Sequence, residues 1–267
     1  MGVPCIVEFR NVTKTFASLT VIRDVTFKVE DTPDRGEFIT VLGPSGCGKS
    51  TILRLIAGLA PHHPPSEGTV LVAERPVGNP GADRGMVFQD YTSFDNRTVE
   101  DNVAFGLECR GVPARQRREL AREWIGKVGL DVKRDARKFP HELSGGMRQR
   151  VAIARTLILS PRIILMDEPF GALDPTTRLH MQELLIGLWR EAEATVFFVT
   201  HSIEEAVYLG DRVYLFSSSP GTLLREITLP RPDRPPKEVQ REKAFTDLVF
   251  EIRDTMDKLE ASTRAGD

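Results

Sequence analysis

The sequence has few cysteines, almost no net charge and no long apolar run, and each of these absences excludes a class of protein. The three cysteines, Cys5, Cys47 and Cys109, are too few and too scattered for a disulfide framework or a metal cluster, which favours a reducing compartment. No apolar run approaches the roughly 18 residues that span a bilayer, and the N-terminus lacks the order of a secretion signal. If the protein serves a membrane, we expect it to act there through a partner.

The balance of charges indicates which partners the protein as a whole can attract electrostatically. The 36 Lys and Arg residues are matched by 38 Asp and Glu residues, so the formal net charge is -2. This near-neutral balance gives no bulk electrostatic case for a nucleic-acid partner, although a local basic patch stays open as an alternative. Hydrophobic residues at 40% and charged residues at 28% exclude intrinsic disorder and indicate a soluble globular protein. A length of 267 residues allows one α/β domain with an appendage, or two units.

The hydrophobic pattern changes along the chain from that of half-buried strands to that of covered strands and helices. Residues 5–30 alternate apolar and polar side chains, which predicts an antiparallel β portion. Residues 162–166 and 195–200 are continuous apolar runs, as in parallel strands covered by helices on both faces. Shorter segments add to this pattern. We expect a turn at 31–36, a buried strand at 37–42 and a further strand at 69–73. Residues 43–51 are too rich in glycine for either strand or helix, a helix follows them, and residues 99–129 have a helical pattern. We expect His62 and His63 to be exposed loop residues and propose no metal there.

A phosphate-binding loop follows the predicted strand at 37–42. Residues 43–50 read GPSGCGKS, which fits the pattern G-x-x-x-x-G-K-[ST] between a strand and a helix. Its glycines let backbone N–H groups converge on phosphate oxygens, and Lys49 adds a point charge for the β- and γ-phosphates. The Ser50 hydroxyl is placed to bind Mg²⁺. The residues expected to hold the nucleotide here are Gly43, Pro44, Ser45, Gly46, Cys47, Gly48, Lys49, Ser50 and Thr51.

A second apolar strand ends in two carboxylates. Residues 163–168 read IILMDE, which delivers Asp167 and Glu168 to the carboxyl edge of a sheet, where open α/β folds bind ligands. We expect Asp167 to hold Mg²⁺ directly or through water, and Glu168 to orient the water that attacks the γ-phosphate. These two motifs alone fit any phosphate-loop NTPase or kinase.

The stretch 143–150, LSGGMRQR, distinguishes between the families of phosphate-loop proteins. Ser144 is a candidate helix N-cap, and Gly145 and Gly146 allow close approach to an anion, so this is a second phosphate-binding helix terminus. The stretch strongly resembles the signature motif of the ATP-binding cassette (ABC) family, and the resemblance extends over residues 5–230. It implies that ATP lies between the phosphate loop of one subunit and the signature of another, so that a lone monomer is catalytically incomplete.

The resemblance implies further roles in the same order along the chain. Phe16 resembles the aromatic residue that stacks on adenine, although a core phenylalanine is an open alternative. Gln89 resembles the glutamine that contacts Mg²⁺ and water. Asp174, in the sequence GALD, resembles the residue that organises the site shared with the opposite subunit. His201 resembles the switch histidine that reaches the γ-phosphate.

The resemblance also implies a fold and a division of the chain. The expected fold is an α/β phosphate-loop NTPase core with a mostly parallel sheet, an N-terminal antiparallel β portion and an inserted helical subdomain. Residues 1–230 would form the ATPase domain, with the helical subdomain at about 90–160, and residues 231–267 a C-terminal helical tail. That tail is indicated by a helical stripe from Phe245 to Leu259.

Residues 91–94 and 98–103 resemble the importer ATPases for nitrate, sulfonate, taurine or bicarbonate. On this resemblance the protein is the ATPase subunit of a small-solute importer on the cytoplasmic face of the cell (inner) membrane. Its partners would be a second copy or a related ATPase subunit, integral membrane permeases and, indirectly, a solute-binding protein, with ATP and Mg²⁺ as cofactors. The chain departs from the group at Asp95-Asn96, where those proteins commonly have Pro-Trp near the permease-docking groove.

Two alternative functions stay open at this point. One is a soluble cassette ATPase that acts on DNA or ribosomes. However, Ser144 lies only 95 positions after Lys49, the segment between them holds no sustained heptads, and the chain has one cassette. The other is the ATPase of an exporter or lipid transporter with a separate permease, which the sequence excludes poorly.

Overall fold

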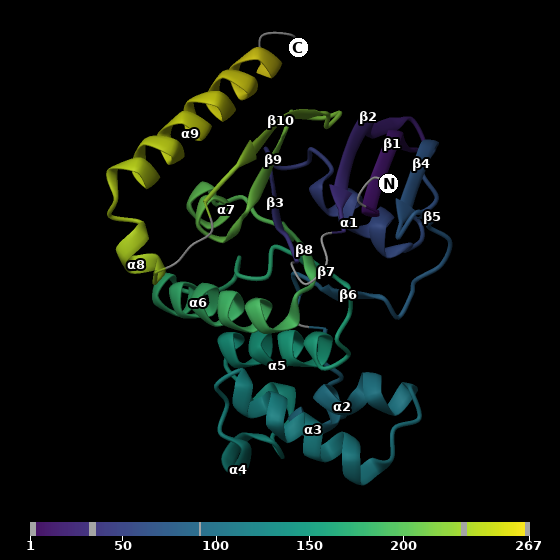
Figure 1. Ribbon diagram of the computed structural model, residues 1–267, viewed down its shortest axis with the longest axis vertical. Coiled ribbons are helices and arrows are strands. Elements are labelled where there is room, and N and C mark those ends of the chain that lie inside the picture. The colour runs from purple at the N-terminus through teal and green to yellow at the C-terminus, as the bar shows by residue number, and fades with distance from the viewer. Residues whose placement is uncertain (1–3, 32–35, 91, 231–233, 265–267) are drawn as a thin grey trace.

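Two β-sheets and several layers of helices make up the described chain (Figure 1). The computed structural model describes residues 4–31, 36–90, 92–230 and 234–264, with side chains as far as residue 258. Tyr91, much of the expected turn at 31–36 and the side chain of Leu259 therefore lie outside the described residues.

The smaller sheet is antiparallel and has the strand order β2-β1-β4-β5. Its strands are β1 (Cys5–Phe16), β2 (Leu19–Glu30), β4 (Glu67–Val72) and β5 (Arg75–Pro76). The alternation expected for residues 5–30 is clearest in β2, where the buried Val25, Phe27 and Val29 alternate with exposed residues. At the start of β1, residues 5–7 are all buried. The predicted antiparallel β portion is thus confirmed, with one apolar face turned inward.

The larger sheet has the order β10-β9-β3-β8-β7-β6 and is parallel except for β10 at its edge. Its strands are β3 (Phe38–Leu42), β6 (Arg84–Val87), β7 (Ile163–Asp167), β8 (Thr195–Val199), β9 (Arg212–Phe216) and β10 (Leu223–Thr228). Because β3, β6, β7 and β8 run the same way, the segments that follow them meet at one edge of the sheet. The phosphate loop, Gln89, Asp167 with Glu168, and His201 follow these four strands.

The helices differ from the expected ones at two places. They are α1 (Lys49–Ala57), α2 (Val99–Cys109), α3 (Ala114–Lys127), α4 (Val132–Asp135), the short 3₁₀ helix η1 (Pro140–Glu142), α5 (Gly145–Leu157), α6 (Pro175–Ala192), α7 (Ile203–Leu209), α8 (Pro236–Val239) and α9 (Lys243–Arg264). Helix α1 begins at Lys49, inside the segment expected to be too glycine-rich for a helix. The helical pattern over 99–129 is two helices, because Gly111 has a φ of 73° and Pro113 cannot continue a helix.

Alternate residues of the larger sheet belong to two different cores. Ile39 and Val41 in β3 pack toward α1 and the antiparallel sheet, whereas Phe38 and Leu42 pack toward α5, α6 and the helices beyond them. The parallel strands are therefore buried on both faces, which explains their continuous apolar sequences. In Figure 1, α1 lies beside the antiparallel sheet, and α5 and α6 lie on the other side of the larger sheet.

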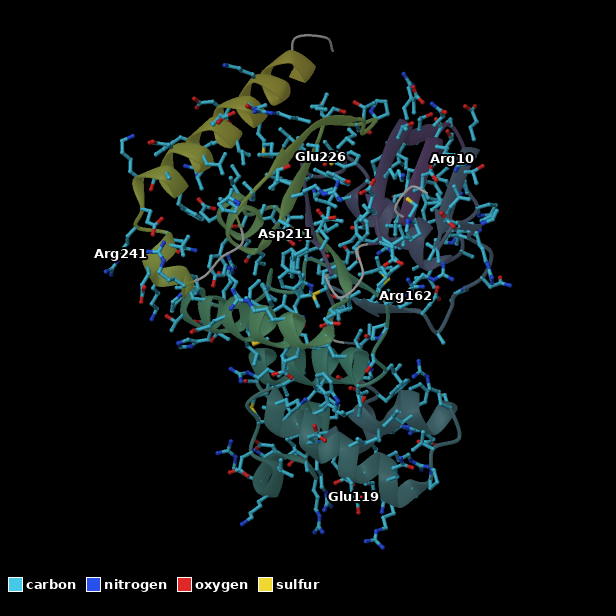
Figure 2. All side chains as sticks on the ribbon, in the orientation of Figure 1. Arg10, Glu119, Arg162, Asp211, Glu226 and Arg241 are labelled. Atoms are coloured by element: carbon cyan, nitrogen blue, oxygen red, sulfur yellow. The ribbon has the colours of Figure 1, made fainter. Side chains whose placement is uncertain are left out.

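Charged side chains cover the outer helices, as the sequence predicts. Arg115 on α3 is 93% exposed, and Glu119 on the same helix points away from the protein in Figure 2. Arg118 and Arg122 pair with Glu100 of α2, at 3.5 Å and 2.8 Å. The arginines of α3 therefore face solvent or a neighbouring helix. Among the residues that the structure describes, no helix is both long and apolar enough to cross a membrane.

Candidate functional site

The phosphate loop joins β3 to α1 and leaves the start of that helix open to an anion. Gly46 and Gly48 have φ angles of 82° and 90°, which favour glycine. A side chain at Gly46 would meet nothing within 4 Å, so this part of the loop faces open space. The N-cap of α1 is Gly48, which forms no side-chain cap, and the first turn holds no acidic residue. The first amides of α1 can therefore donate to an external anion.

Lys49 lies at the inner side of this loop. Its side chain is buried, and Nζ donates to the carbonyl oxygens of Gly43 at 2.7 Å and Pro44 at 2.9 Å. These hydrogen-bond partners are neutral, and a buried cation favours a nearby anion. A hollow of about 270 Å³ lies beside it, lined by Val21, Ser45, Gly46, Gly48, Lys49, Ser50, Thr51 and Glu168.

Ser50, which lines the hollow, is hydrogen-bonded to Asp167 at the end of β7. The Ser50 hydroxyl donates to Asp167 Oδ1 at 2.7 Å, and Arg54 Nη2 lies 3.7 Å from Asp167 Oδ2. Burial raises the pKa of the Asp167 carboxyl, although Ser50 and Arg54 favour its ionised form. The hydroxyl and carboxylate oxygens fit Mg²⁺, which prefers hard oxygen ligands, and both come from rigid elements. Arg54 was missed at the sequence level, although its i+4 spacing from Ser50 puts it on the same face of α1.

A chain of contacts links this carboxylate to Phe16. Arg54 Nη1 donates to His62 Nε2 at 3.2 Å, and the His62 ring meets the edge of the half-buried Phe16 ring at a centroid distance of 5.1 Å. Lys14 Nζ lies over the Phe16 ring, 5.0 Å from its centroid. The expectation that His62 and His63 are exposed is wrong, because both are half-buried. Burial and the charge of Arg54 lower the pKa of His62, which keeps the ring neutral and able to accept from Arg54.

Glu168 lines the hollow from the end of β7 and contacts His201. Its φ is 45°, an unusual value for a residue with a side chain, and its amide donates to Val199 O of β8 at 3.0 Å. Its carboxylate Oε2 lies 3.3 Å from Nδ1 of His201, which is 57% exposed. Strained backbone of this kind is concentrated at functional sites. The structure therefore joins the expected water-orienting carboxylate and the expected switch histidine.

The segment that carries His201 is tied to the start of α6. Thr200 Oγ1 donates to Glu205 Oε2 at 2.6 Å, and Arg178 Nε of α6 lies 3.5 Å from Glu205 Oε1. Burial raises the pKa of Glu205, which is 5% exposed. Nothing in the sequence pattern singled out Glu205 or Arg178. Gln89 is exposed two residues beyond β6, the neighbour of β7, so it lies at the same sheet edge as Asp167.

The signature residues and Asp174 form a second group. Ser144 caps α5 by accepting from the Met147 amide at 3.3 Å, and Asp174 caps α6 by accepting from the Thr176 and Thr177 amides at 3.1 Å. The two helix starts are close, since a side chain at Gly146 would lie 2.9 Å from Thr177 Cγ2. Hydrogen bonds from Thr177 lower the pKa of Asp174. Helix α5 packs on α2, α3, α6 and β6, and none of residues 144–146 lines the described hollow at Lys49.

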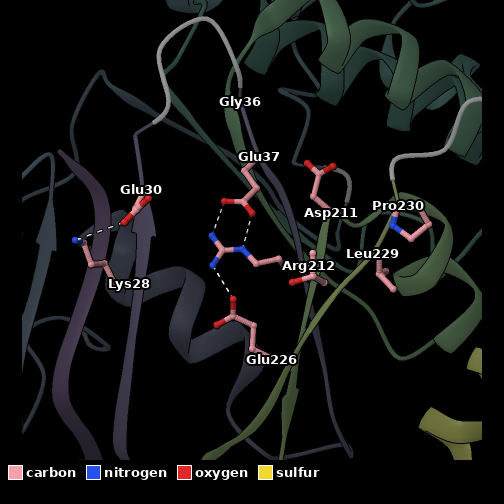
Figure 3. Close-up of a pocket in the computed structure, with 10 residues that line it drawn as sticks. Lys28, Glu30, Gly36, Glu37, Asp211, Arg212, Glu226, Leu229 and Pro230 are labelled. Atoms are coloured by element: carbon pink, nitrogen blue, oxygen red, sulfur yellow. Dashed lines mark hydrogen bonds and ion pairs between the residues drawn. The ribbon is translucent and has the colours of Figure 1, made fainter. Parts of the chain in front are cut away.

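A larger hollow, of about 920 Å³, lies elsewhere and has a different character (Figure 3). Arg212 points into it between Glu37 and Glu226, and both carboxylates bind the guanidinium. Lys28 lies 3.9 Å from Glu30 on the opposite wall. These cations are matched by carboxylates of the same wall, so the hollow offers no anion site comparable to the one at Lys49.

A glycine loop with a buried lysine, a serine bound to a strand-end aspartate and an adjacent glutamate define a phosphate-loop nucleoside triphosphatase. The comparisons with known proteins make this more specific. The chain belongs to the ABC transporter family, whose model matches residues 22–171. It is therefore an ABC-type ATPase, as the resemblance of the signature motif implied.

The relatives point to one group within the family. The nitrate import ATP-binding protein NrtD of Synechocystis is 46% identical over 241 residues, which cover 88% of this chain and 87% of that protein. The taurine import ATP-binding protein TauB of Escherichia coli is 47% identical over 198 residues, covering 74% and 76%. The dimeric post-hydrolysis structure of the cassette MJ0796, bound to ADP and Pi, is 34% identical with a TM-score of 0.72, covering 84% of this chain and 99% of that one. The chain thus resembles importer ATPases, as predicted.

Proposed function

We propose that this chain is the ATP-hydrolysing subunit of a multi-subunit importer of a small solute, of the nitrate or taurine kind. The observation that carries the proposal is the convergence of Lys49, Ser50, Asp167, Glu168 and His201 at one sheet edge, in a chain that is similar to NrtD and TauB over most of its length. The protein would act at the cytoplasmic face of the cell membrane, bound to integral permeases, and a separate solute-binding protein would deliver the solute.

The residues of the phosphate loop and Lys49 would bind the triphosphate of ATP. The open amides at the start of α1 and the ammonium group of Lys49 supply positive potential on the same side of the hollow. Phe16 would stack on adenine, with Lys14 over its ring. Ser50, Asp167 and Gln89 would hold Mg²⁺, which neutralises charge that develops on the β- and γ-phosphates.

Glu168 would orient the attacking water and accept its proton. Its side chain lines the hollow beside Lys49, and His201 Nδ1 keeps one carboxylate oxygen in place. His201, which is more than half exposed, can turn toward the γ-phosphate. Reaction then depends on positioning and electrostatics and needs no covalent intermediate.

A second subunit would complete the site. Ser144, Gly145, Gly146 and Asp174 gather on a face of the chain that does not line the hollow at Lys49, so each chain offers two half-sites. Two copies, or this chain with a related ATPase subunit, would close head to tail around two ATP molecules. Closure would move residues of about 90–160 with the attached permeases, and hydrolysis would reopen the dimer.

The experiment that tests the proposal substitutes Glu168→Gln. ATP hydrolysis should fall by about 10²- to 10⁴-fold, the usual contribution of a general base. The variant should form a dimer with ATP that gel filtration with light scattering detects. Glu119→Gln, at an exposed position of α3, is the matched control and should behave as the wild type. Unchanged hydrolysis in Glu168→Gln would remove this residue from the role assigned to it.

Transport requires a separate test with the permease present. In membranes that contain a permease that co-purifies with this chain, together with its solute-binding protein, solute uptake should require ATP and should stop with Glu168→Gln. Outward movement of solute under the same conditions would overturn the importer assignment and favour an exporter.

A further inference from the structure

The tip of the β9–β10 hairpin, residues 217–222, is tied to the strand that borders the nucleotide hollow. The Gly221 amide donates to Val21 O at 2.8 Å, and the Arg23 amide donates to Gly221 O at 3.0 Å. Gly221 also forms an isolated parallel bridge with Ile22. Figure 1 shows the hairpin reaching across to β2. The C-terminal hairpin and the N-terminal sheet are therefore joined directly behind the phosphate loop.

Gly221 lies so close to this loop that no side chain fits. A Cβ at this position would lie 2.0 Å from the carbonyl oxygen of Cys47 and 3.1 Å from its carbonyl carbon. Contacts shorter than 3.0 Å are essentially never seen for Cβ atoms, and here the neighbour is backbone. Gly221 is not among the residues with positive φ, so space alone requires glycine here.

The loop is held from behind at other points as well. A Cβ at Gly43 would lie 3.1 Å from Phe216 Cβ, at the end of β9, and a Cβ at Gly48 would lie 2.4 Å from Ile22 Cγ2. Cys47 itself is fully buried. In contrast, a Cβ at Gly46, at the front of the loop, would meet nothing within 4 Å. The rear of the loop is thus fixed by β2 and the hairpin, while its front faces the hollow.

Ser217 closes the hairpin tip and sets its shape. Its hydroxyl accepts from the Thr222 amide at 2.8 Å and lies 3.2 Å from Pro220 O. The Ser217 amide also donates to Thr222 O at 3.0 Å. Removing this hydroxyl should loosen the tip without adding any atom behind the phosphate loop.

We infer that Gly221 is a positioning residue of the phosphate loop, which it acts on through the backbone of Cys47. The inference rests on the proposed nucleotide site and extends it, because Gly221 lies outside residues 22–171, which the family model matches. A methyl group at Gly221 must push Cys47 by about 1 Å, and displacements of this size reduce the efficiency of a site by up to about 10²-fold.

The first test compares Gly221→Ala with Gly187→Ala, a glycine of α6 where a Cβ meets nothing within 4 Å. We expect Gly221→Ala to raise the Kd for ATP and for ADP by about ten- to hundredfold, with a rise in KM that exceeds any change in kcat. Gly187→Ala should bind and hydrolyse ATP as the wild type. Ser217→Ala should shift the Kd in the same direction by a smaller factor, and it carries the test if Gly221→Ala does not fold.

The second test measures whether Cys47 has moved. In a Cys5→Ser, Cys109→Ser background, the remaining thiol should react slowly with a maleimide, because it is buried and burial raises its pKa. Adding Gly221→Ala should speed labelling at least tenfold, whereas adding Gly187→Ala should not. Nucleotide affinities and labelling rates equal to those of Gly187→Ala would overturn the inference. Labelling that ATP fails to slow even in the background protein would instead overturn the proposed nucleotide site.

Discussion

Asn102 holds the backbone of residues 94–98, which include Asp95-Asn96, where the chain differs from the importer group. The loss of stability in Asn102→Ala can be worked out from the contacts of its side chain. Its side chain is fully buried. Oδ1 accepts from the Phe94 amide at 2.8 Å, and Nδ2 donates to the carbonyl oxygens of Phe94, Arg97 and Thr98 at 3.0 to 3.1 Å. This one amide thus adds to the backbone hydrogen bonds of residues 94–98, where Phe94 O also accepts from the Arg97 amide at 3.0 Å and Thr98 O from the Asn102 amide at 2.8 Å. Phe94 also packs on Phe105 at a centroid distance of 4.5 Å.

Asn102→Ala removes all four contacts at once. Each net hydrogen bond contributes about 1 kcal/mol, and backbone groups left without partners add to the loss, so we expect unfolding to become easier by about 2–4 kcal/mol. For a chain of this size, that is a fall in the melting temperature of roughly 5–15 °C. Calorimetry and urea denaturation measure the effect. Asn96→Ala, at an exposed position of the same segment, should change the unfolding free energy by less than about 0.5 kcal/mol.

The result also bears on permease binding. If Asn102 holds the segment in a binding shape, Asn102→Ala should lose the permease in co-purification while ATP binding by the isolated subunit persists. Equal stability of Asn102→Ala and Asn96→Ala would show that the four contacts contribute nothing to the free energy of unfolding.

Two further predictions concern the site itself. Burial raises the folded-state pKa of Asp167, so its ionised form destabilises the folded protein above the unfolded-state pKa. Asp167→Asn should therefore melt at a higher temperature than the wild type at pH 7, and this difference should shrink as the pH falls through the folded-state pKa. The same variant should lose ATP hydrolysis. A wild type that melts at or above the variant at pH 7 would contradict this. Phe16→Ala should raise the Kd for ATP by roughly 5- to 100-fold, as expected from the loss of base stacking, whereas Phe250→Ala, at an exposed position of α9, should leave it unchanged. Equal affinities of these two variants in titration calorimetry would make Phe16 a core residue only.

The parts of the fold that local chemistry encodes could be predicted from the sequence. The phosphate loop has a fixed spacing, and the apolar run before Asp167 ends abruptly in acids, so both were located together with the strands that carry them. The antiparallel β portion and the parallel strands β3, β7 and β8 follow from the sequence because alternation and continuous apolar runs report burial directly.

The elements that were missed depend on distant neighbours. Strand β10 and helix α7 are short, and their sequences mix apolar and polar residues, so no period identifies them. Strand β9 is also short, and its apolar run is only the four residues 213–216. The sequence predicts an exposed position for His62, and its burial is not visible there because the contacts with Phe16 and Arg54 bring together three separate segments. The same holds for Glu205, whose partners Thr200 and Arg178 lie on different elements. Spacing along one segment cannot report such contacts.

We expect one triphosphate to be bound by two polypeptides, and mixing two defective variants shows whether it is. In a Glu168→Gln background, Lys49→Ala removes the phosphate-loop charge, and Ser144→Glu places a negative charge at the signature. Native mass spectrometry should find monomers when either variant is given ATP alone. Their mixture should form a heterodimer that holds one ATP, at the site where both halves are intact. A mixture that stays monomeric, or a single variant that dimerises with ATP as the Glu168→Gln protein does, would show that the triphosphate is not shared between two polypeptides.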